Sequence, residues 1–191
     1  MKLNFVTSNE GKLKWVETML KKFDIKIIQK KLDLTEPRDT DVLEVVKHKC
    51  EEAKNKISEP FIVEDSGFYI KALNGFPSTF VKFGLSTIGV DGICRLLKSE
   101  KNRKAYFKSV LGYFDGKETH FFICKDDGDI AKEPRGENLR GFNELFKIFI
   151  PQGFSKTLAE MSDTEYDSYQ DKIKVIDHYH LFSEWLVNET K

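Results

Sequence analysis

The chain has 191 residues, of which 40% are hydrophobic and 32% charged, so it is long and apolar enough to form a well-packed domain. Lys plus Arg and Asp plus Glu both number 31, and this zero formal charge excludes a global attraction to nucleic acid or to an anionic membrane. Three scattered cysteines, no signal peptide and no apolar run of about 20 residues predict a cytoplasmic protein with free thiols.

The first half of the chain alternates strand and helix patterns. Short apolar runs predict strands, and apolar residues three or four positions apart predict helices. The expected strands cover 3–7, 25–29 and 61–65, and the expected helices cover 10–23, 40–57 and 87–97. We expect the third strand to end in a turn at Gly67, and 67–73 to form a short antiparallel partner for it.

The second half is rich in hairpin signals and closes with one long helix. The expected elements are strands at 104–114, 120–124 and 130–131, turns at 115–116 and 126–129, and a helix at 165–186. Strand–helix alternation followed by hairpins predicts an α/β domain around one mixed sheet. We expect residues 1–191 to form a single domain, either as one body or as two lobes around a cleft.

Two adjacent acids, Glu64 and Asp65, close the third apolar run. Acidic residues are depleted in strands, so this pair favours a role in metal binding or water activation over a structural one. Carboxylates in such a place can hold Mg²⁺ through one or two oxygens and leave the other positions to water and phosphate. Glu36, in the loop before the second helix, could bring a third carboxylate to the same sheet edge, although its position alone favours an ordinary exposed acid.

A polar turn joins the first strand to the first helix. Ser8 and Asn9 are good N-cap residues, and a plain helix cap is enough to explain them. The alternative is a phosphate site, because free backbone N–H groups at a helix start attract phosphate and Lys12 lies one turn inside. The four histidines show no ligand spacing, and we expect none of them to bind metal.

Seven short segments in this order resemble the Ham1 family, the inosine triphosphate pyrophosphatases. The segments are 7–12, 34–36, 64–67, 73–77 with 80–82, 105–107, 134–136 and 157–161. The resemblance implies a Ham1-like fold, with a long twisted mixed sheet flanked by helices and a central cleft. It also implies Mg²⁺-dependent hydrolysis of deaminated purine nucleoside triphosphates to the monophosphate and pyrophosphate, by a protein that forms a homodimer.

The resemblance assigns roles to individual residues. Lys12 would bind the triphosphate as a catalytic residue, and Asp65 would position or deprotonate the attacking water. Glu36, Glu64 and Asp65 would hold Mg²⁺. The further substrate-binding residues would be Thr7, Ser8 and Asn9 in the opening loop, and Ser66 and Gly67 in the acidic motif.

Two segments depart from the family pattern, and both serve nucleoside recognition in the family. Its Phe-Gly-Tyr/Trp-Asp-Pro segment is replaced here by a stretch that keeps Phe142 and continues with Asn143. Counted from Met161, the position of its Ser-His-Arg triplet holds Gln170, Asp171 and Lys172. These residues are our candidates for substrate recognition. We therefore predict a nucleoside triphosphate pyrophosphatase with altered or relaxed base selectivity; the alternatives are action on another pyrophosphate compound, or an inactive relative that binds a nucleotide or a partner.

Overall fold

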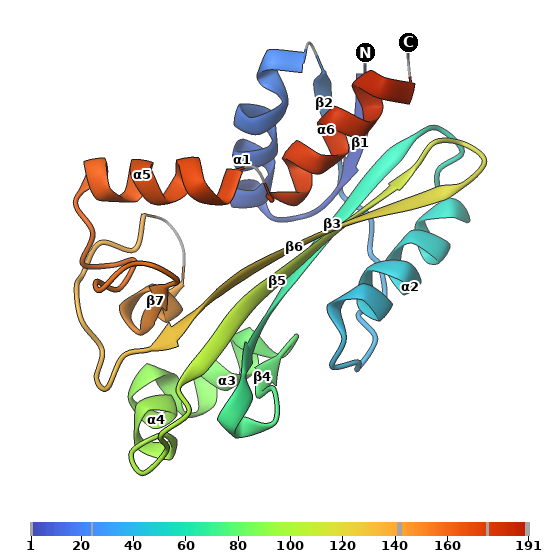
Figure 1. The fold of residues 1–191 in the computed structure, drawn as a ribbon. Helices are drawn as coiled ribbons and strands as arrows, with labels where there is room; N and C mark the ends of the chain where they lie inside the picture. The colour runs from blue at the N-terminus through green and yellow to red at the C-terminus, as the bar shows by residue number, and fades with distance from the viewer. Residues whose placement is uncertain (1, 24, 141–142, 175, 190–191) are drawn as a thin grey trace. The chain divides into compact units, whose positions relative to one another are not determined.

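The computed structural model describes residues 2–23, 25–140, 143–174 and 176–189. Its seven described strands form one sheet in the order β2-β1-β3-β5-β6-β7, and β4 pairs with β3 outside this path (Figure 1). β1 is parallel to β2 and β3, whereas the β3–β4 and β6–β7 pairs are antiparallel, so the sheet is mixed. The strands are β1 (Lys2–Val6), β2 (Lys26–Lys30), β3 (Phe61–Ile70), β4 (Pro77–Ser78), β5 (Lys104–Phe114), β6 (Thr119–Ile130) and β7 (Phe149–Pro151).

Six α-helices lie within the described residues, and local sequence sets where the first two begin. Asn9 caps one through its Oδ1, which accepts the N–H groups of Gly11 and Lys12, and Asp41 caps the next by accepting the N–H of Leu43. The helices are α1 (Glu10–Leu20), α2 (Val42–Lys54), α3 (Val81–Thr87), α4 (Gly89–Leu96), α5 (Asp163–Lys174) and α6 (His178–Glu189). Within this part of the chain, no helix is long and apolar enough to cross a membrane.

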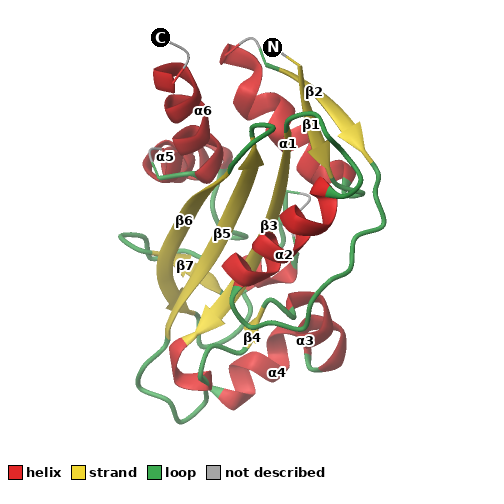
Figure 2. Cartoon of the chain, turned by 90° about the vertical axis from the view of Figure 1, so that its right-hand side faces the viewer, coloured by secondary structure: helices red, strands yellow, loops and turns green. Residues whose placement is uncertain are grey.

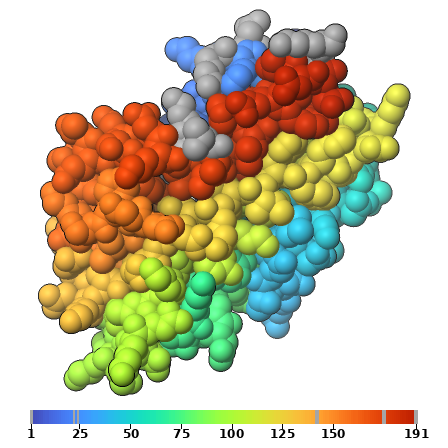
Figure 3. Space-filling view, in the orientation of Figure 1, coloured from blue at the N-terminus to red at the C-terminus, as the bar shows by residue number. Residues whose placement is uncertain are grey.

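The chain divides into two compact units. The first unit contains Met1–Ser66, Ser109–Cys124 and Val175–Lys191, and the second contains Gly67–Lys108 and Lys125–Lys174. Strands β3, β5 and β6 contribute residues to both. In the first unit, α2 covers one face of the sheet and α1 and α6 cover the other (Figures 1 and 2). Figure 3 shows α6 lying over the N-terminal segment of the same unit.

Side-chain alternation along β3 separates two cores of the first unit. Ile62 packs with Leu3, Phe5 and Phe182 in the core beneath α1 and α6. The next residue, Val63, packs in the core beneath α2. Successive strand residues point to opposite faces, so the two acids that follow also leave the strand on opposite sides.

The structure corrects the prediction that the third strand ends at the acids. β3 continues through Gly67 to Ile70, because Phe68 and Ile70 are buried in the core of the second unit and keep the strand alternation. Residues 67–73 are therefore not a separate antiparallel partner; that partner is the short strand β4. Residues 71–73 form a 3-10 turn instead.

The predicted turn at 126–129 is also wrong, because these residues lie in β6, which ends at Ile130. The acidic run suggested a solvated loop, yet each acid has a partner. The Tyr169 hydroxyl donates a hydrogen bond to Asp126, Lys125 pairs with Asp127, and Lys104 pairs with Asp129. Because neighbouring side chains satisfy these carboxylates, the strand continues through them.

The predicted helix over 165–186 is two helices, α5 and α6. Asp177 begins the second one, since its Oδ1 accepts the N–H of Tyr179 at 2.8 Å. Tyr179 and Phe182 then enter the core beneath α1 and α6. The sequence also missed α3, while the α/β class and the mixed sheet flanked by helices are confirmed.

Candidate active site

A continuous chain of ion pairs joins the four acidic and basic residues that the sequence singled out, together with one lysine that it did not. Lys12 Nζ lies 2.9 Å from Glu64 Oε2 and 3.6 Å from Asp65 Oδ1. Lys49 Nζ lies 2.6 Å from Asp65 Oδ2 and 3.0 Å from Glu36 Oε1. The order of contacts is therefore Glu64, Lys12, Asp65, Lys49 and Glu36, with Asp65 between two ammonium groups.

Four segments of the first unit place the five members of this chain. Lys12 lies in the first turn of α1, and its ammonium also donates to the backbone carbonyl of Glu64 at 3.3 Å. Lys49 projects from the buried face of α2 and is only 9% exposed as a whole residue. Glu36 comes from the irregular segment between β2 and α2. Both remaining acids come from β3, so helix, loop and strand converge on one point.

The strand geometry divides the predicted acid pair. Asp65 is on the α2 face of β3, where it shares Lys49 with Glu36. Glu64 is on the opposite face, where its side chain is only 6% exposed and lies near His178. Asp65 therefore shares a cation with each of the other two acids: with Glu36 at the Lys49 ammonium, and with Glu64 at the Lys12 ammonium.

Charges in the cluster offset the cost of burial. Burial raises the pKa of Asp65, but Lys12 and Lys49 outweigh it and hold that pKa below its ordinary value. Burial likewise lowers the pKa of Lys12, and the carboxylates of Glu64 and Asp65 more than compensate, so the pKa is raised. The pKa of Lys49 is raised in the same way, mainly by Asp65. At neutral pH Asp65 is a carboxylate and both lysines are ammonium groups.

His178 lies at the buried end of this cluster. Its Nε2 is 4.0 Å from Glu64 Oε1 and its Nδ1 is 3.7 Å from Asp177 Oδ2, so neither ring nitrogen has a hydrogen-bond partner among the described residues. Its ring packs on Tyr179, whose pKa is raised well above its ordinary value, chiefly by burial. A buried polar group without a partner carries a desolvation cost.

In the opening loop, the side chains support the helix start. Thr7 Oγ1 accepts the backbone N–H of Asn9 at 3.1 Å, and Asn9 Oδ1 caps α1. The helix-cap interpretation is thus confirmed for Asn9, which is the N-cap of α1, and Ser8 is exposed next to it. In β3, the backbone N–H of Ser66 donates a hydrogen bond to Asp65 Oδ1 at 2.8 Å and helps to fix the orientation of that carboxylate.

The predicted recognition residues belong to the second unit, except for Phe142, which lies outside the described residues. Asn143 caps a 3-10 turn by accepting the N–H of Leu145 at 3.0 Å. Gln170, Asp171 and Lys172 lie in α5, and the Lys172 ammonium sits over the ring of Phe154 at 4.4 Å. The start of the final helix, where the family triplet was expected, is at His178 and not at these three residues.

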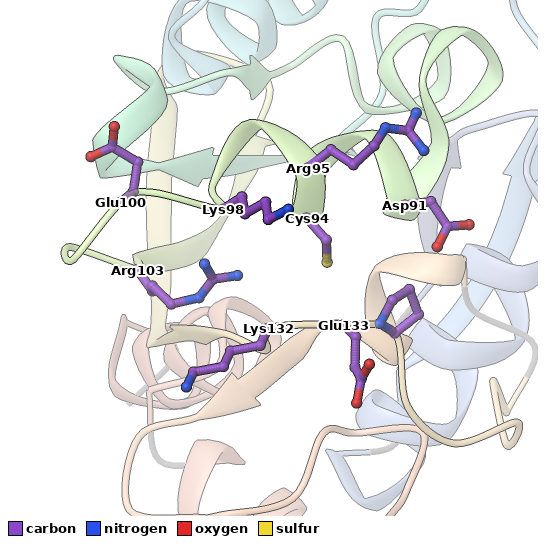
Figure 4. A pocket seen from close by; sticks show the side chains of 9 residues that line it. Asp91, Cys94, Arg95, Lys98, Glu100, Arg103, Lys132 and Glu133 are labelled. Atoms are coloured by element: carbon purple, nitrogen blue, oxygen red, sulfur yellow. The ribbon is translucent and has the colours of Figure 1, made fainter.

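Gly67 opens the second unit, where there is no room for a side chain. A Cβ there would lie 2.8 Å from the ring of Tyr69 and 2.9 Å from the carbonyl oxygen of Ser78. The glycine is therefore required for the close approach of β3 and β4. The same unit contains a pocket of about 450 Å³ lined by Cys94, Lys98 and Lys132 among others, and none of the predicted site residues lines it (Figure 4).

Sequence reasoning missed Lys49 and His178. The sequence does contain a signal for Lys49, because a lysine on the buried face of a helix needs a carboxylate partner for its ammonium. His178 gave no such signal, since it was placed in the middle of one long helix. Among the described residues, no three His, Cys, Asp or Glu side chains form a preassembled metal-binding group.

The chain is an α/β protein with a mixed sheet, and its site combines ammonium groups, which can contact phosphate oxygens, with carboxylates, which can hold a divalent ion. Comparison with known proteins identifies the family. Residues 3–178 match the model of the Ham1 family, and the chain belongs to this family.

Curated relatives match over almost their whole length. The dITP/XTP pyrophosphatase of Thermococcus kodakarensis is 38% identical over 191 residues, which is 100% of both chains. The dITP/XTP pyrophosphatase of Pyrococcus horikoshii is 39% identical over 187 residues, or 97% of each chain. The match to the Thermococcus kodakarensis protein covers every residue of this chain.

Solved structures show the same fold. The Ham1 protein of Staphylococcus aureus superposes with a TM-score of 0.78 over 99% of this chain and 100% of its own, at 24% identity. A HAM1 protein from Coxiella burnetii gives a TM-score of 0.79, covering 98% and 99% of the two chains, also at 24% identity. The predicted Ham1-like fold is thereby confirmed.

Proposed function

We propose that this protein hydrolyses deaminated purine nucleoside triphosphates, such as ITP, XTP and dITP, to the monophosphate and pyrophosphate. The family and the names of its full-length relatives support this reaction. The observation that carries it is the ion-pair chain, in which Asp65 is held between Lys12 and Lys49. Such a group offers cations to a polyphosphate and a carboxylate to a nucleophilic water.

The donor set fits Mg²⁺, which we include in the proposal. Glu36 Oε1 and Asp65 Oδ2 both contact the Lys49 ammonium, so two carboxylate oxygens converge on one cationic centre. Oxygen ligands from one or two carboxylates, completed by water and phosphate, are what Mg²⁺ takes in such sites. When bound, the ion would neutralise negative charge on the phosphate oxygens. Glu64 remains our proposed third ligand, since its Oε2 contacts the same Lys12 ammonium as Asp65 Oδ1, at 2.9 and 3.6 Å.

The protein's own residues have separate tasks in this reaction. Lys12 and Lys49 bind phosphate oxygens and counter the charge that builds up on the leaving pyrophosphate. Asp65, which is ionised because both lysines lower its pKa, accepts the proton of the water that attacks the α-phosphorus. Ser66 keeps the carboxylate oriented through its backbone N–H. Asn143, Gln170, Asp171 and Lys172 remain our candidates for reading the base, together with Phe142.

A panel of nucleoside triphosphates tests the proposed activity. Pyrophosphate release from dITP, XTP, ATP and GTP is measured with Mg²⁺ at matched concentrations. We expect turnover of dITP or XTP, with ATP and GTP slower; comparable rates on all four would indicate relaxed base selectivity. Release from none of them would contradict the proposal and favour the alternative of an inactive nucleotide- or partner-binding relative.

We propose a homodimer in the cytoplasm, without a nucleic-acid or membrane partner. The three cysteines are free and buried, as suits a reducing compartment. Light scattering on the eluted protein tests the dimer, which should have twice the 22.2 kDa mass of one chain. A mass near that of one chain at micromolar concentration would contradict it.

A further inference from the structure

The Lys49 ammonium occupies the position where the two carboxylates best placed to share a metal ion come together. It lies 3.0 Å from Glu36 Oε1 and 2.6 Å from Asp65 Oδ2. An ammonium group and a divalent ion cannot both take the same oxygen lone pairs, and two cations at that separation repel each other. Lys49 therefore stabilises the two carboxylates and also competes with a metal ion for them.

The packing around Lys49 keeps its ammonium group in place between the two carboxylates. Its side chain is 11% exposed and rises from the buried face of α2, next to Val45, Val46 and Cys50. Glu36, by contrast, is on an irregular segment and its side chain is 81% exposed. Of the two groups, the carboxylate is the one that can change partner, while the ammonium stays close to where it is.

Lys12 repeats the arrangement on the other oxygen of Asp65. Its ammonium contacts Glu64 Oε2 at 2.9 Å and Asp65 Oδ1 at 3.6 Å. A polyphosphate tail carries several negative oxygens, and these would give both lysines a new partner. Once the lysines contact phosphate, the oxygens of Asp65 and Glu36 become available to a metal ion.

We propose that Lys12 and Lys49 couple metal binding to polyphosphate binding, by holding the metal-binding carboxylates until phosphate oxygens take over the two ammonium groups. This inference rests on the proposed function and deepens it. The divalent ion alone then binds weakly, and it binds strongly together with the triphosphate. Because such coupling is reciprocal, the triphosphate is also bound more tightly when the ion is present.

Binding of Mn²⁺, followed by the EPR signal of the free ion, tests the coupling without any turnover. The probe nucleotide is the α,β-methylene analogue of dITP, whose scissile position cannot be hydrolysed. For the unaltered protein we expect the analogue to tighten Mn²⁺ binding at least about tenfold, within the usual range of coupling between sites. For Lys49→Gln we expect Mn²⁺ alone to bind at least about fivefold more tightly, because the competing charge is gone.

Two variants keep the test independent of folding and of general charge effects. Lys12→Gln, at a more exposed position, should also strengthen binding of Mn²⁺ alone, even if Lys49→Gln proves unstable. Lys47→Gln is the matched control, since Lys47 is on the same helix and pairs with Glu44 at 2.8 Å outside the site. It should leave the Mn²⁺ affinity unchanged.

Equal Mn²⁺ affinity with and without the analogue, or an unchanged or weaker affinity in Lys49→Gln and Lys12→Gln, would overturn the coupling. Pyrophosphate release by the unaltered protein would continue in that case, so the proposed function would stand. Failure to bind Mn²⁺ even with the analogue would overturn both the coupling and the metal dependence in the proposed function.

Discussion

His178 is a buried imidazole beside a buried carboxylate, and its packing and polar roles can be separated by substitution. Phenylalanine preserves the ring contact with Tyr179, and it removes two nitrogens that have no hydrogen-bond partner among the described residues. We expect His178→Phe to change the Tm by less than about 4 °C. We expect kcat/KM to fall at least about tenfold, because the imidazole lies 4.0 Å from Glu64 at the buried end of the site.

Thermal melting and steady-state pyrophosphate release are measured on the same preparation of His178→Phe. Full activity combined with a lower Tm would show that the histidine serves packing alone.

For individual residues, the sequence predicted which side chains belong to the site better than it predicted which of them contact one another. Lys12, Glu36, Glu64 and Asp65 were predicted from their positions at a helix start, in a loop and at a strand, and the family resemblance assigned their roles. The structure joins them in one chain of contacts. The sequence could not predict that Glu36 and Asp65 share a cation, because only the strand alternation together with the position of α2 decides which acids face each other. Lys49 was hidden among apolar helix neighbours.

At the scale of elements, a hydrogen bond from Tyr169 to Asp126 joins α5 to β6, and the pKa of this aspartate is raised. Burial raises the pKa of Asp126 to about 6, although the Tyr169 hydroxyl donates to it at 2.6 Å. The folded state therefore binds this proton more tightly than the unfolded chain, whose pKa is about 3.9. The contribution to stability is full below about pH 4 and is lost as the pH rises to about 6 and above.

Asp126→Asn should remove this pH dependence and raise the free energy of unfolding at pH 8 by about 2 kcal/mol, since the buried charge disappears. Urea denaturation at pH 5 and pH 8 measures both effects. Asp127→Asn, at the adjacent position with an exposed ion pair, is the control. A variant that loses stability at pH 8 would show that the ionised carboxylate is the form the fold requires.

Arg103 ties the end of α4 to the end of β6. Its guanidinium donates to the carbonyl oxygens of Leu97, Ile130 and Ala131 at 2.8, 2.7 and 2.6 Å. A lysine cannot reproduce this planar fork. We expect Arg103→Lys to lower the free energy of unfolding by about 2 kcal/mol, because buried carbonyls lose their donors. Lys101→Arg, at an exposed position in the same turn, should have no effect in the same denaturation experiment; equal stability of both variants would contradict this role.

The errors in predicting elements have physical causes. The acids at 126–129 suggested a turn, but tyrosine and lysine side chains satisfy them within a strand. The pair Glu64-Asp65 suggested a strand end, but the buried Phe68 and Ile70 carry β3 onwards. In each case the deciding partner is distant in sequence, so a local pattern could not include it.

The molecule as a whole carries no net charge, with a sequence pI near 6.9. Binding to nucleic acid depends largely on cations that neutralise phosphates, so a balanced chain should not be retained by it. We expect elution from a heparin column below about 0.2 M salt at pH 7.5. Retention to much higher salt would reveal a basic surface that the overall charge conceals.

The fold itself was predictable from the sequence, because alternating strands and helices and seven family segments agreed on one answer. The likeness to solved Ham1 proteins at 24% identity confirms that answer. The sequence did not predict which residues belong to each of the two units. β3, β5 and β6 each pass from one unit into the other, and a strand pattern does not reveal where one core gives way to the next.

To test whether Asp65 is the catalytic base, pyrophosphate release from dITP or XTP is measured for Asp65→Asn and for the control Asp127→Asn, whose exposed side chain lies on β6. The asparagine keeps the shape of Asp65 but cannot accept the water proton, so we predict that kcat falls at least about a hundredfold, while circular dichroism and the control remain unchanged. Activity of Asp65→Asn close to that of the unaltered protein would contradict the claim that the carboxylate between Lys12 and Lys49 is the centre of catalysis.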